Sequence, residues 1–432
     1  MVAKETQWLT VHVNNEEERA MGDFHEVVIV GGGIGGSALA AVLARAGRDV
    51  LLLEQTEVFE DRVRGEWIAP WGVVETQRLG LFDTLKAAGG HHIGRHVTYD
   101  ETRTPEEAEA RTLPLGMFAA DVPGPLAIGN PHHSQTLFDA ATAAGARTLR
   151  GALVTAVSPG AEPSVTFLHG DVEHTVRCRL IVGADGRSSK VRETAGITLH
   201  QDKPHHWFAG MLVEGAGGWD QDLQAIGTED DFAFLAFPQG GDKVRLYGSY
   251  ALDQKGRFGG PEGQRRFLEA FRLNCCPAGE TIAAGTPAGP VLSYFNNDSW
   301  TDTQAAPGVV LVGDAAGWND PIVGLGLSIT YRDVRTVRDV LLGGDDWSPA
   351  AFGAYAEERA ERMRRLRFAA SITSVIDAEF GPEAKARRRS YFERTNADPS
   401  LGAHGFAVMA GPEALPAEIF TPEHRARVLE GA

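Results

Sequence analysis

The sequence predicts an α/β fold: a parallel sheet flanked by helices, an inserted and mainly antiparallel β domain, and a C-terminal helical region. Three patterns carry this prediction. Residues 27–30 form an apolar β-branched run that leads into a glycine-rich turn and a small-residue helix, which is typical of a βαβ unit. Residues 231–238 and 243–252 are short apolar runs separated by turn signals, which is typical of antiparallel strands. From Pro349 onward mixed charge recurs at a helical period, and we expect an exposed, salt-bridged helix there.

The glycine-rich turn is spaced for a phosphate ligand. Residues 25–36 read H-E-V-V-I-V-G-G-G-I-G-G, so the first strand ends in Gly31-x-Gly33-x-x-Gly36. We expect Gly31 to permit a tight turn, Gly33 to let a pyrophosphate approach the backbone because it lacks a Cβ, and Gly36 to let the helix pack close to the sheet. The start of that helix would offer free N–H groups and a positive dipole end to the phosphates.

A second strand supplies an acidic residue at the expected spacing. The apolar stretch 49–53 ends in Glu54, which follows the glycines by roughly the twenty residues typical of this motif. A carboxylate there is placed to bind ribose hydroxyls. Strand, glycine turn, helix, strand and acid in this order predict a Rossmann-like domain that binds a dinucleotide.

Two further motifs follow in the same predicted domain. Residues 180–192 read L-I-V-G-A-D-G-R-S-S-K-V-R, and residues 309–331 read V-V-L-V-G-D-A-A-G-W-N-D-P-I-V-G-L-G-L-S-I-T-Y. In the second motif a strand delivers Asp314, whose carboxylate can accept a hydrogen bond from a sugar-like hydroxyl. A proline and Gly324-x-Gly326 then open a helix, whose N-terminal amides would stabilise negative charge on a bound cofactor.

These three motifs, in this order, resemble the FAD-dependent monooxygenases of the aromatic-hydroxylase (p-hydroxybenzoate hydroxylase-like) superfamily, which is distantly shared with flavin-dependent halogenases and geranylgeranyl reductases. The resemblance covers residues 24–370 approximately. It implies FAD as the cofactor, NADH or NADPH as a transient reductant, and oxygen transfer from O2 through a flavin C4a-hydroperoxide to a small-molecule aromatic substrate. The residues expected to bind the cofactor are Gly31, Gly33, Ile34, Gly35, Gly36, Glu54, Arg64, Gln135, Val154, Asp185, Gly186, Gly313, Asp314, Pro321, Gly324, Gly326 and Leu327.

The chain departs from the pattern of that family in two places. Many relatives carry a histidine where this chain has Gly317. They also carry an arginine at the start of a helix where residues 128–137 of this chain read I-G-N-P-H-H-S-Q-T-L. Gln135, on that helix, is a candidate substitute contact. Arg64, in R-G-E-W-I-A-P, lies where relatives place an arginine beside the flavin.

Candidate catalytic residues lie near the expected flavin-ring contact and on the inserted strands. Trp318 is expected to line the reaction chamber, either stacked on the substrate or packed in the core. Asp320 either binds a substrate hydroxyl or caps the next helix. Arg245 and Tyr247 share one face of a strand and are candidates for orienting an acidic or phenolic substrate. The aromatic candidates for the pocket wall are Phe232, Phe234 and Phe237, of which the first two fit the core of the sheet equally well.

The predicted domains are discontinuous along the chain. Residues 24–90, 126–200 and 298–345 form the FAD-binding domain, residues 91–125 and 201–297 the substrate domain, residues 346–432 the C-terminal helical region, and residues 1–23 a flexible N-terminal arm. Within the FAD-binding domain, helices are expected at 79–85, 135–144 and 325–342, and strands at 152–157, 164–168, 176–182 and 309–312.

Composition and charge argue against several classes of protein. The 432 residues carry a net charge of −17, from 41 basic and 58 acidic residues, which disfavours nucleic acid or an anionic membrane as a partner. No apolar run approaches the length of a membrane helix. The cysteines Cys178, Cys275 and Cys276 form neither a disulfide framework nor a metal spacing, so we expect a cytoplasmic protein. A monomer or homodimer is expected. The histidine pairs at 91–92, 132–133 and 205–206 would point to opposite faces of a strand, so no metal site is predicted.

Three alternatives to a monooxygenase stay open. The stretch 64–85 also resembles flavin-dependent halogenases, but residues 91–96 read H-H-I-G-R-H where halogenases place a lysine, and their Trp-x-Trp-x-Ile-Pro signature is absent. The sequence G-D-A-A-G at 313–317 also fits a geranylgeranyl-reductase-like oxidoreductase. A flavin-bound module without turnover is the third alternative. No second G-x-G-x-x-G follows a strand, so NADH or NADPH would bind across the domain cleft.

Overall fold

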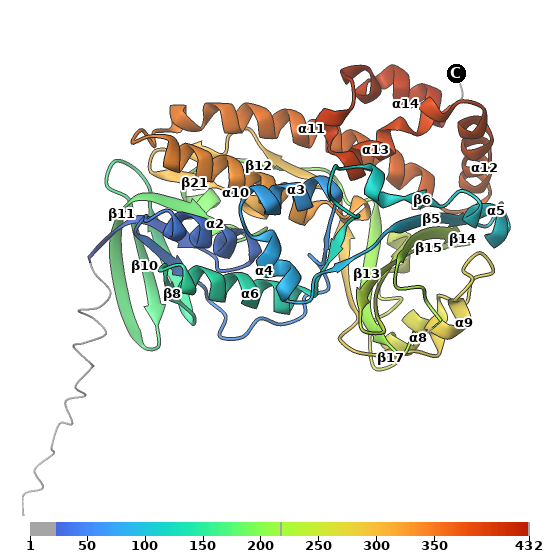
Figure 1. Ribbon diagram of the computed structural model, residues 1–432, viewed down its shortest axis with the longest axis horizontal. Helices are drawn as coiled ribbons and strands as arrows, with labels where there is room; N and C mark the ends of the chain where they lie inside the picture. Colours follow the sequence, from blue (N-terminus) through green and yellow to red (C-terminus); the bar gives the residue numbers. More distant parts are fainter. Residues whose placement is uncertain (1–22, 217, 431–432) are drawn as a thin grey trace, which may run out of the picture.

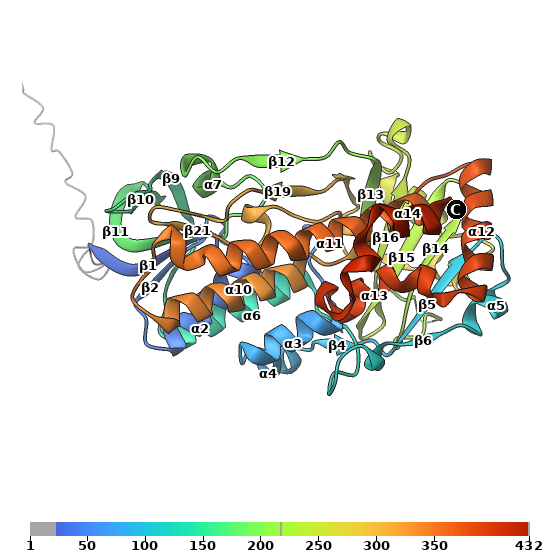
Figure 2. The same ribbon diagram turned by 90° about the horizontal axis from the view of Figure 1, so that it is seen from above.

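The computed structural model describes residues 23–430 apart from residue 217, so the predicted flexible arm at 1–23 lies, but for Asp23, outside the described residues. A parallel sheet lies at one end of the molecule and an antiparallel sheet at the other (Figure 1). The helices α10 (Gly326–Gly343) and α11 (Gly353–Asp377) lie side by side, and α11 extends from the first sheet towards the second (Figure 2). The predicted α/β fold class is therefore confirmed.

The first sheet has the order β20-β21-β11-β1-β2-β8, and its strands from β21 to β8 are parallel. The hairpin β9–β10 pairs antiparallel with the long strand β11. Residues 27–30 of β1 are buried on both faces of the sheet, which is why this strand reads as a continuous apolar run. The strands are β1 (Phe24–Val30), β2 (Val50–Leu53), β8 (Arg147–Leu149), β9 (Ala152–Ser158), β10 (Ser164–His169), β11 (Val172–Gly183), β20 (Ala305–Ala306) and β21 (Val309–Leu311).

Helices α2 (Ile34–Arg45), α6 (Asn130–Ala143) and α10 pack together on one face of this sheet. The alanine-rich residues 38–44 of α2 are all buried, because small side chains let the helix lie close to the strands. On the other face, α7 (Lys190–Thr194) packs against β9, β11 and β21. The carboxyl ends of the parallel strands point to one edge of the sheet, and the loops that leave β1, β11 and β21 therefore converge on one cavity.

The second sheet has the order β17-β13-β16-β15-β14-β5-β6, with β18 paired to β13, and it is antiparallel except where β14 lies beside β5. One face carries Phe232 and Phe234 into an aromatic core covered by α8 (Gly263–Glu269), and the opposite face carries Leu235 and Phe237. The strands are β5 (Arg95–Asp100), β6 (Leu113–Pro114), β13 (His206–Glu214), β14 (Leu223–Glu229), β15 (Phe232–Gly240), β16 (Lys243–Tyr250), β17 (Thr286–Pro287) and β18 (Leu292–Asn296). The predicted substrate-domain segments thus supply this sheet, while the exact domain boundaries stay a proposal.

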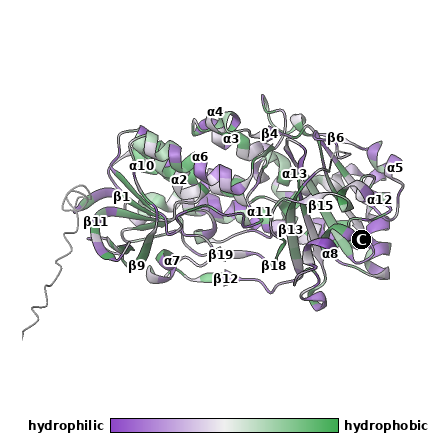
Figure 3. Cartoon of the chain, turned by 90° about the horizontal axis from the view of Figure 1, so that it is seen from below, coloured by the Kyte–Doolittle hydropathy of each residue, from purple (hydrophilic) through white to green (hydrophobic). Residues whose placement is uncertain are grey.

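Short elements complete the fold. The strands β3 (Trp67–Ile68), β7 (Leu126–Ala127) and β4 (His91–His92) form a small sheet, and β12 (Leu199–Gln201) pairs with β19 (Ser299–Thr301). The remaining helices are α3 (Pro70–Arg78), α4 (Phe82–Ala87), α5 (Pro105–Glu109), α9 (Gly279–Ala283), α12 (Pro382–Ala397), α13 (Ala403–Ala410) and α14 (Pro422–Leu429). The outer helices α5 and α12 consist mainly of hydrophilic residues (Figure 3). Across the described residues, no helix combines the length and the apolar character needed to cross a bilayer.

Most elements predicted in the first domain are confirmed to within a few residues. The helix expected at 135–144 begins earlier, at Asn130, because Pro131 is well suited to the first turn of a helix. The prediction of a single helix at 79–85 is wrong. This segment joins the end of α3 to α4, and Gly80, at a φ of +65°, separates the two helices.

One face of α11 contradicts the expectation of an exposed, salt-bridged helix. Arg359 and Arg362 are 1% and 3% exposed, and both pair with Asp333 of α10, which is fully buried. The opposite face does keep exposed pairs, such as Glu361 with Arg364. The periodicity of α11 could not separate its two faces, because the carboxylate that neutralises the buried arginines lies on another helix.

Candidate cofactor and substrate site

The glycine turn after β1 forms one end of a large cavity. Gly31 has a φ of +103°, which favours glycine, and a Cβ added to Gly36 would lie 1.9 Å from the Gly31 carbonyl oxygen. Gly33 lines the cavity, and a Cβ on it would meet no heavy atom within 4 Å. The backbone of the helix start is therefore open to a ligand at Gly33 and closed to any larger side chain at Gly36.

Glu54 stands at the same end of the cavity in a fixed orientation. Its Oε2 accepts a hydrogen bond from the Gly32 N–H at 2.7 Å, and its Oε1 accepts from the Thr56 N–H and hydroxyl, both at 2.8 Å. Glu54 is buried yet lines the cavity. Oε2 accepts one hydrogen bond and therefore keeps a lone pair for a further donor, such as a sugar hydroxyl.

The turn after β21 forms the opposite wall. Asp314 lies in the 3-10 helix η3 (Gly313–Ala316) that follows the strand, and its Oδ2 accepts from Arg187 Nε at 3.3 Å. The first turn of α10 adds Gly326, Leu327 and Thr330 to the wall. A polar group and a helix start thus face the glycine turn across the cavity.

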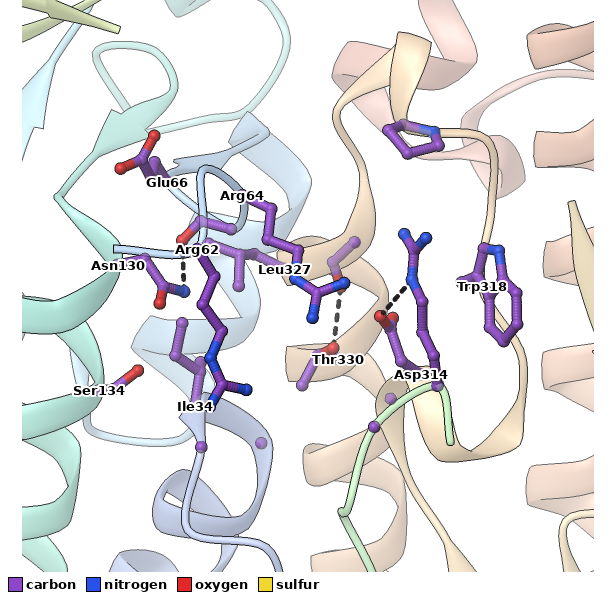
Figure 4. A pocket seen from close by; sticks show the side chains of 18 of the residues that line it. Ile34, Arg62, Arg64, Glu66, Asn130, Ser134, Asp314, Trp318, Leu327 and Thr330 are labelled. Carbon is purple, nitrogen blue, oxygen red and sulfur yellow. Dashed lines mark hydrogen bonds and ion pairs between the residues drawn. The ribbon is translucent and has the colours of Figure 1, made fainter. Parts of the chain in front are cut away.

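Three arginine side chains line the cavity: Arg62, Arg64 and Arg187. Figure 4 shows Arg64 reaching from its loop towards Thr330 and Asp314, while Arg62 lies beside Ile34. Burial lowers the pKa of Arg64, and repulsion by Arg187 lowers it further. Such a cluster in a chain with a net charge of −17 provides a local site for an anion, such as a pyrophosphate.

The loop that carries Arg62 and Arg64 is held at both sides. The Val63 N–H donates to Asp61 Oδ1 at 2.7 Å, and the Tyr294 hydroxyl donates to the Val63 carbonyl at 3.2 Å. Val63 is fully buried at a φ of +54°, a conformation that β-branched residues rarely adopt. Strain of this kind is typical of functional sites, where surrounding contacts hold the backbone in place.

Arg359 of α11 supports the cavity from behind. Its guanidinium donates to the carbonyl oxygens of Ala316, Gly313 and Gly317 at 2.8, 3.1 and 2.9 Å. It also pairs with Asp333, whose Oδ2 accepts from the Gly313 N–H at 2.9 Å. The turn that presents Asp314 to the cavity therefore depends on a residue more than forty positions along the chain.

Beyond Arg64 the cavity changes character and reaches the second sheet. Its wall there is mainly aromatic and aliphatic, and comprises Trp67, Phe208, Leu235, Phe237, Tyr247 and Tyr294. The expected aromatic wall is thus supplied by Phe237, whereas Phe232 and Phe234 take the alternative role of core residues, because neighbouring positions on a strand face opposite sides.

A polar array lies within this apolar wall. The Tyr247 hydroxyl donates to Glu66 Oε2 at 3.2 Å, and both residues line the cavity. Burial raises the pKa of Tyr247 well above its usual range, and the nearby Glu66 raises it further. Arg245 forms ion pairs with Glu66 and with Asp61 Oδ2, the latter at 2.8 Å. The negative charge of Glu66 raises the pKa of Arg245, although burial acts in the opposite direction.

A family model described as an FAD binding domain matches residues 25–369. The match spans most of the chain and includes all three predicted motifs. The chain belongs to the FAD binding domain family. The predicted cofactor, FAD, is thereby confirmed.

Curated relatives of this FAD-binding protein include oxygenases and a reductase. Squalene monooxygenase of Mus musculus is 25% identical over 347 residues, which are 73% of this chain and 54% of that protein, so the chain spans about half its length. The 3-demethoxyubiquinol 3-hydroxylase of Escherichia coli (strain K12) is 28% identical over 354 residues, with 79% and 85% of the two chains covered. Menaquinone reductase of Mycolicibacterium smegmatis is 30% identical over 349 residues, covering 75% and 78%.

Solved structures share the fold. The p-nitrophenol 4-monooxygenase of Pseudomonas putida DLL-E4 superposes with a TM-score of 0.74 at 19% identity, over 94% of this chain and 98% of that one. The flavin-dependent halogenase CmlS superposes with a TM-score of 0.72 at 16% identity, over 95% and 78%. The expected kinship with hydroxylases and halogenases is confirmed at the level of the fold.

Most of the residues predicted to bind FAD line the cavity together. They are Gly33, Ile34, Gly35, Glu54, Arg64, Gly186, Gly313, Asp314, Pro321, Gly324, Gly326 and Leu327. The catalytic candidates Trp318 and Tyr247 line it as well. The ring of Trp318 is buried and lies 4.9 Å from the Arg187 guanidinium. Trp318 is therefore both a core residue and part of the cavity wall.

The cavity wall does not include the other predicted cofactor contacts. Gly31 and Gly36 shape the turn behind it. Asp185 accepts from the Ser189 hydroxyl and the Val191 N–H, and so holds the start of α7. Gln135, another predicted contact, forms hydrogen bonds with Asp139 and Arg150. Val154, the last of them, packs against the hydrophobic core that includes Val28 and Val30 of β1.

The catalytic candidates Arg245 and Asp320 also lie behind the wall. Arg245 anchors Glu66 instead of facing the cavity. Asp320 Oδ1 accepts from the Ile322 N–H at 2.9 Å and caps the 3-10 helix η4 (Pro321–Val323), which is the capping role that the sequence left open. Burial raises the pKa of Asp320 to about 8.

Several lining residues were not singled out from the sequence. They include Thr56, Arg62, Glu66, Asn130, Ser134, Arg187, Tyr294 and Thr330. Arg187 lies inside the quoted motif G-A-D-G-R-S-S-K, so its proximity to Asp185 and Gly186 was an available signal. Glu66 and Tyr294 carried no local signal, because Glu66 reaches the cavity from the loop before β3 and Tyr294 reaches it from β18 of the second sheet.

Replacing Asp314 with alanine is expected to weaken FAD retention. The change removes the carboxylate that η3 contributes to the cavity and would leave a ribityl-type hydroxyl without a partner, which costs about 1–3 kcal/mol. That loss corresponds to roughly 5- to 150-fold in the dissociation constant, measured by FAD fluorescence on dilution of the holoprotein. Asp314→Asn keeps an acceptor oxygen and should lose less. Equal retention by Asp314→Ala and the parent protein would contradict the assignment.

Proposed function

We propose that this protein is an FAD-dependent monooxygenase that uses NADH or NADPH and O2 to hydroxylate an aromatic or similar electron-rich small molecule. The observation that carries the proposal is a single cavity that joins the dinucleotide cradle at Gly33, Glu54 and Asp314 to the aromatic face of the second sheet at Phe237 and Tyr247. A ligand held in the cradle and a substrate held on that face would be neighbours.

The residues present fit FAD. The Gly33 backbone is open, three arginines lie between the glycine turn and the aromatic chamber, and Glu54 and Asp314 offer acceptors on opposite walls. Bound FAD would supply electron transfer from the nicotinamide and activation of O2. The protein would contribute the position of the substrate, the removal of its proton and the exclusion of water.

Tyr247 and Glu66 are proposed to act on the substrate hydroxyl. Tyr247 donates its own proton to Glu66, so its oxygen is free to accept a hydrogen bond from a phenol in the cavity. Burial raises the pKa of Glu66 and Arg245 opposes that rise, and an ionised Glu66 would draw the proton through Tyr247. Trp67, Phe208 and Phe237 would hold the ring by aromatic contact.

Replacing Tyr247 with phenylalanine tests this role. We expect the rate of coupled hydroxylation of a phenol to fall by roughly 100-fold, because general-base assistance is lost, while FAD retention and flavin reduction stay near parent values. Tyr250→Phe is the matched control, because Tyr250 lies on the same strand but bonds Ser293 away from the cavity. An unchanged hydroxylation rate in Tyr247→Phe would remove Tyr247 from the mechanism.

Isotope labelling tests the reaction type. The holoprotein, NADH or NADPH, and a phenolic or quinol-type substrate are incubated under labelled O2, and the product is examined by mass spectrometry. We expect labelled oxygen in the product and equal consumption of nicotinamide and substrate. Chloride or bromide should alter neither product nor rate beyond the effect of ionic strength. A halogenated product, or oxygen that comes from water, would contradict monooxygenation.

The relatives support this proposal and its alternatives to different degrees. A 3-demethoxyubiquinol 3-hydroxylase and a p-nitrophenol 4-monooxygenase are both named for oxygenation of ring compounds. The halogenase alternative rests on a shared fold, and the described residues that line the cavity include no lysine. The menaquinone reductase relative keeps a reductase as the second candidate, which would reduce its substrate without consuming O2.

The proposed partners are small molecules. The net charge of −17 disfavours nucleic acid and anionic membranes, and a monomer or homodimer is proposed. A cytoplasmic location is also a proposal, and it is supported by the three cysteines, which are free and buried.

A further inference from the structure

Three side chains with metal-binding atoms meet just behind the cavity wall, where β13 begins and the chain approaches η4. His205, His206 and Asp320 each offer one ligand atom, and these atoms lie within 4.8 Å of one another. His205 Nε2 lies 3.4 Å from Asp320 Oδ2, and His206 Nε2 lies 3.8 Å from Asp320 Oδ1. The 3.4 Å separation is close to that of two ligands that share one cation at about 2.0–2.2 Å, and the 3.8 Å distance shows that the His206 ring also lies beside Asp320.

The two histidines lie on the same side of the chain, contrary to the expectation for neighbours on a strand. β13 begins at His206, so His205 precedes the regular strand and does not follow its alternation. The ring centroids are 4.9 Å apart, and the two Nδ1 atoms are 3.0 Å apart. The reasoning that excluded a metal at residues 205–206 is therefore wrong for this pair.

The carboxylate of this cluster has little compensation from basic residues. Asp320 is 1% exposed, and among the described residues no arginine or lysine forms an ion pair with it. Its Oδ2 has no hydrogen bond of good geometry in that part of the chain, although the Asn296 amide lies near the carboxyl group. A second buried carboxylate, Asp298, accepts from the Asp320 N–H at 2.9 Å. Two buried carboxyl groups this close are costly to ionise unless a cation is near.

The nearest arginines are held elsewhere. Arg187 pairs with Asp314 and lies over the ring of Trp318. The guanidinium of Arg367 lies 4.6 Å from the ring of Trp300. Neither forms an ion pair with Asp320, so the charge of the cluster is left to the two imidazoles or to a bound ion.

We propose that His205, His206 and Asp320 bind a divalent transition-metal ion, of the class of Zn²⁺, Co²⁺ or Fe²⁺. Two imidazoles and one carboxylate are a ligand set that such ions prefer over Ca²⁺ or Mg²⁺. The side chain of His205 is 40% exposed, which provides an entry path and a position for water as a further ligand.

Asn296 completes the surroundings of the ion. Its Nδ2 lies 2.9 Å from His206 Nε2, and its Oδ1 has no partner among the described residues. The two ends of an amide are assigned from their hydrogen bonds, and the reversed orientation lets Oδ1 accept from the His206 Nε2–H. His206 would then bind the ion through Nδ1, with its ring orientation set by Asn296, as is typical of metal-binding histidines.

The ion would join the two halves of the cavity. Trp318, Asn319 and Pro321 flank Asp320 and line the cofactor side, whereas His206 begins the strand that carries Phe208 on the substrate side. A metal bridge between Asp320 and His206 would therefore fix the wall of one half against the sheet of the other, and it would act independently of the reaction catalysed.

Metal titration of the FAD-loaded protein tests the proposal. The protein is treated with a chelator and shown to keep its flavin spectrum, and Zn²⁺ and Co²⁺ are then added in separate titrations followed by calorimetry. We expect one equivalent to bind, Co²⁺ to give visible d–d absorption, and Zn²⁺ to raise the thermal unfolding midpoint. Loss of a direct ligand in His205→Ala or His206→Ala should weaken binding by roughly 100-fold or more, since even an outer partner contributes 10- to 100-fold.

Matched variants keep the result decisive. His200→Ala removes an exposed histidine that pairs with Asp302 at 2.8 Å, outside the cluster, and should bind the metals as the parent does. His205→Ala alters a partly exposed side chain, so its far-ultraviolet spectrum and flavin content should match the parent. If the parent binds neither ion more tightly than His205→Ala does, the cluster is a hydrogen-bonded acid–imidazole group and the proposal is overturned.

Discussion

Alanine at Gly33 should weaken FAD binding in a protein that still folds, whereas alanine at Gly36 should destabilise the fold itself. A Cβ at Gly33 meets no protein atom within 4 Å and its φ of −68° suits any residue, so only a ligand would feel the change. A steric conflict of this kind costs about 1–3 kcal/mol, which is roughly 5- to 150-fold in FAD affinity. We would measure that affinity by flavin fluorescence.

The two glycine variants serve as controls for each other. A Cβ at Gly36 would lie 1.9 Å from the Gly31 carbonyl oxygen, and the turn cannot yield because Gly31 itself needs a positive φ. Urea unfolding of the flavin-free proteins should show parent-like stability for Gly33→Ala and a loss of several kcal/mol, of order 3, for Gly36→Ala. Parent-like FAD affinity in Gly33→Ala would show that the pyrophosphate does not approach this turn.

Methionine at Arg359 is expected to have the second large effect. Arg359 is 1% exposed and donates to three carbonyl oxygens of the turn that carries Asp314, besides pairing with Asp333. The change removes one donor from each of these carbonyls, although Thr301 still donates to Ala316, and among the described residues it leaves Arg362 as the ion-pair partner of Asp333. Removing one partner of a buried ion pair costs about 3–5 kcal/mol. We expect a fall of this size in the free energy of unfolding, together with release of FAD.

The matched control is the same substitution at an exposed position of α11. Arg364 pairs with Glu361 at 2.7 Å, and both side chains are 46% exposed. Arg364→Met should change the free energy of unfolding by less than about 0.5 kcal/mol, as is usual for surface substitutions. If Arg359→Met were as mild as Arg364→Met, the buried network would not hold the Asp314 turn in place.

Local geometry explains why the cofactor half of the site was predictable. The roles predicted for Gly31, Gly33 and Gly36 depend on backbone angles and spacing within six residues. The structure shows a positive φ at Gly31, open space at Gly33 and close packing at Gly36. Glu54 and Asp314 were found in the same way, because a residue at the carboxyl end of a parallel strand must face the edge where the other strands also end.

The substrate half could be predicted only in outline. Alternation along β15 indicates that Phe237 faces away from Phe232 and Phe234, but not which face meets the cofactor. Tyr247 was a candidate, yet its partner Glu66 lies 181 positions earlier, in the loop just before β3 of the small sheet. Pairing of that kind depends on how two sheets dock.

The sequence by itself determined the α/β class, the dinucleotide cradle and the family, because each depends on contacts between residues close along the chain. Only the tertiary structure decided that Arg359 supports the Asp314 turn, that Arg245 stands behind Glu66, and that His205 and His206 point the same way. These depend on carboxylates and carbonyls brought from distant segments, and a side chain's periodicity carries no information about the charge that it will meet. An arginine or a histidine cluster becomes buried only where residues from other parts of the chain supply its partners.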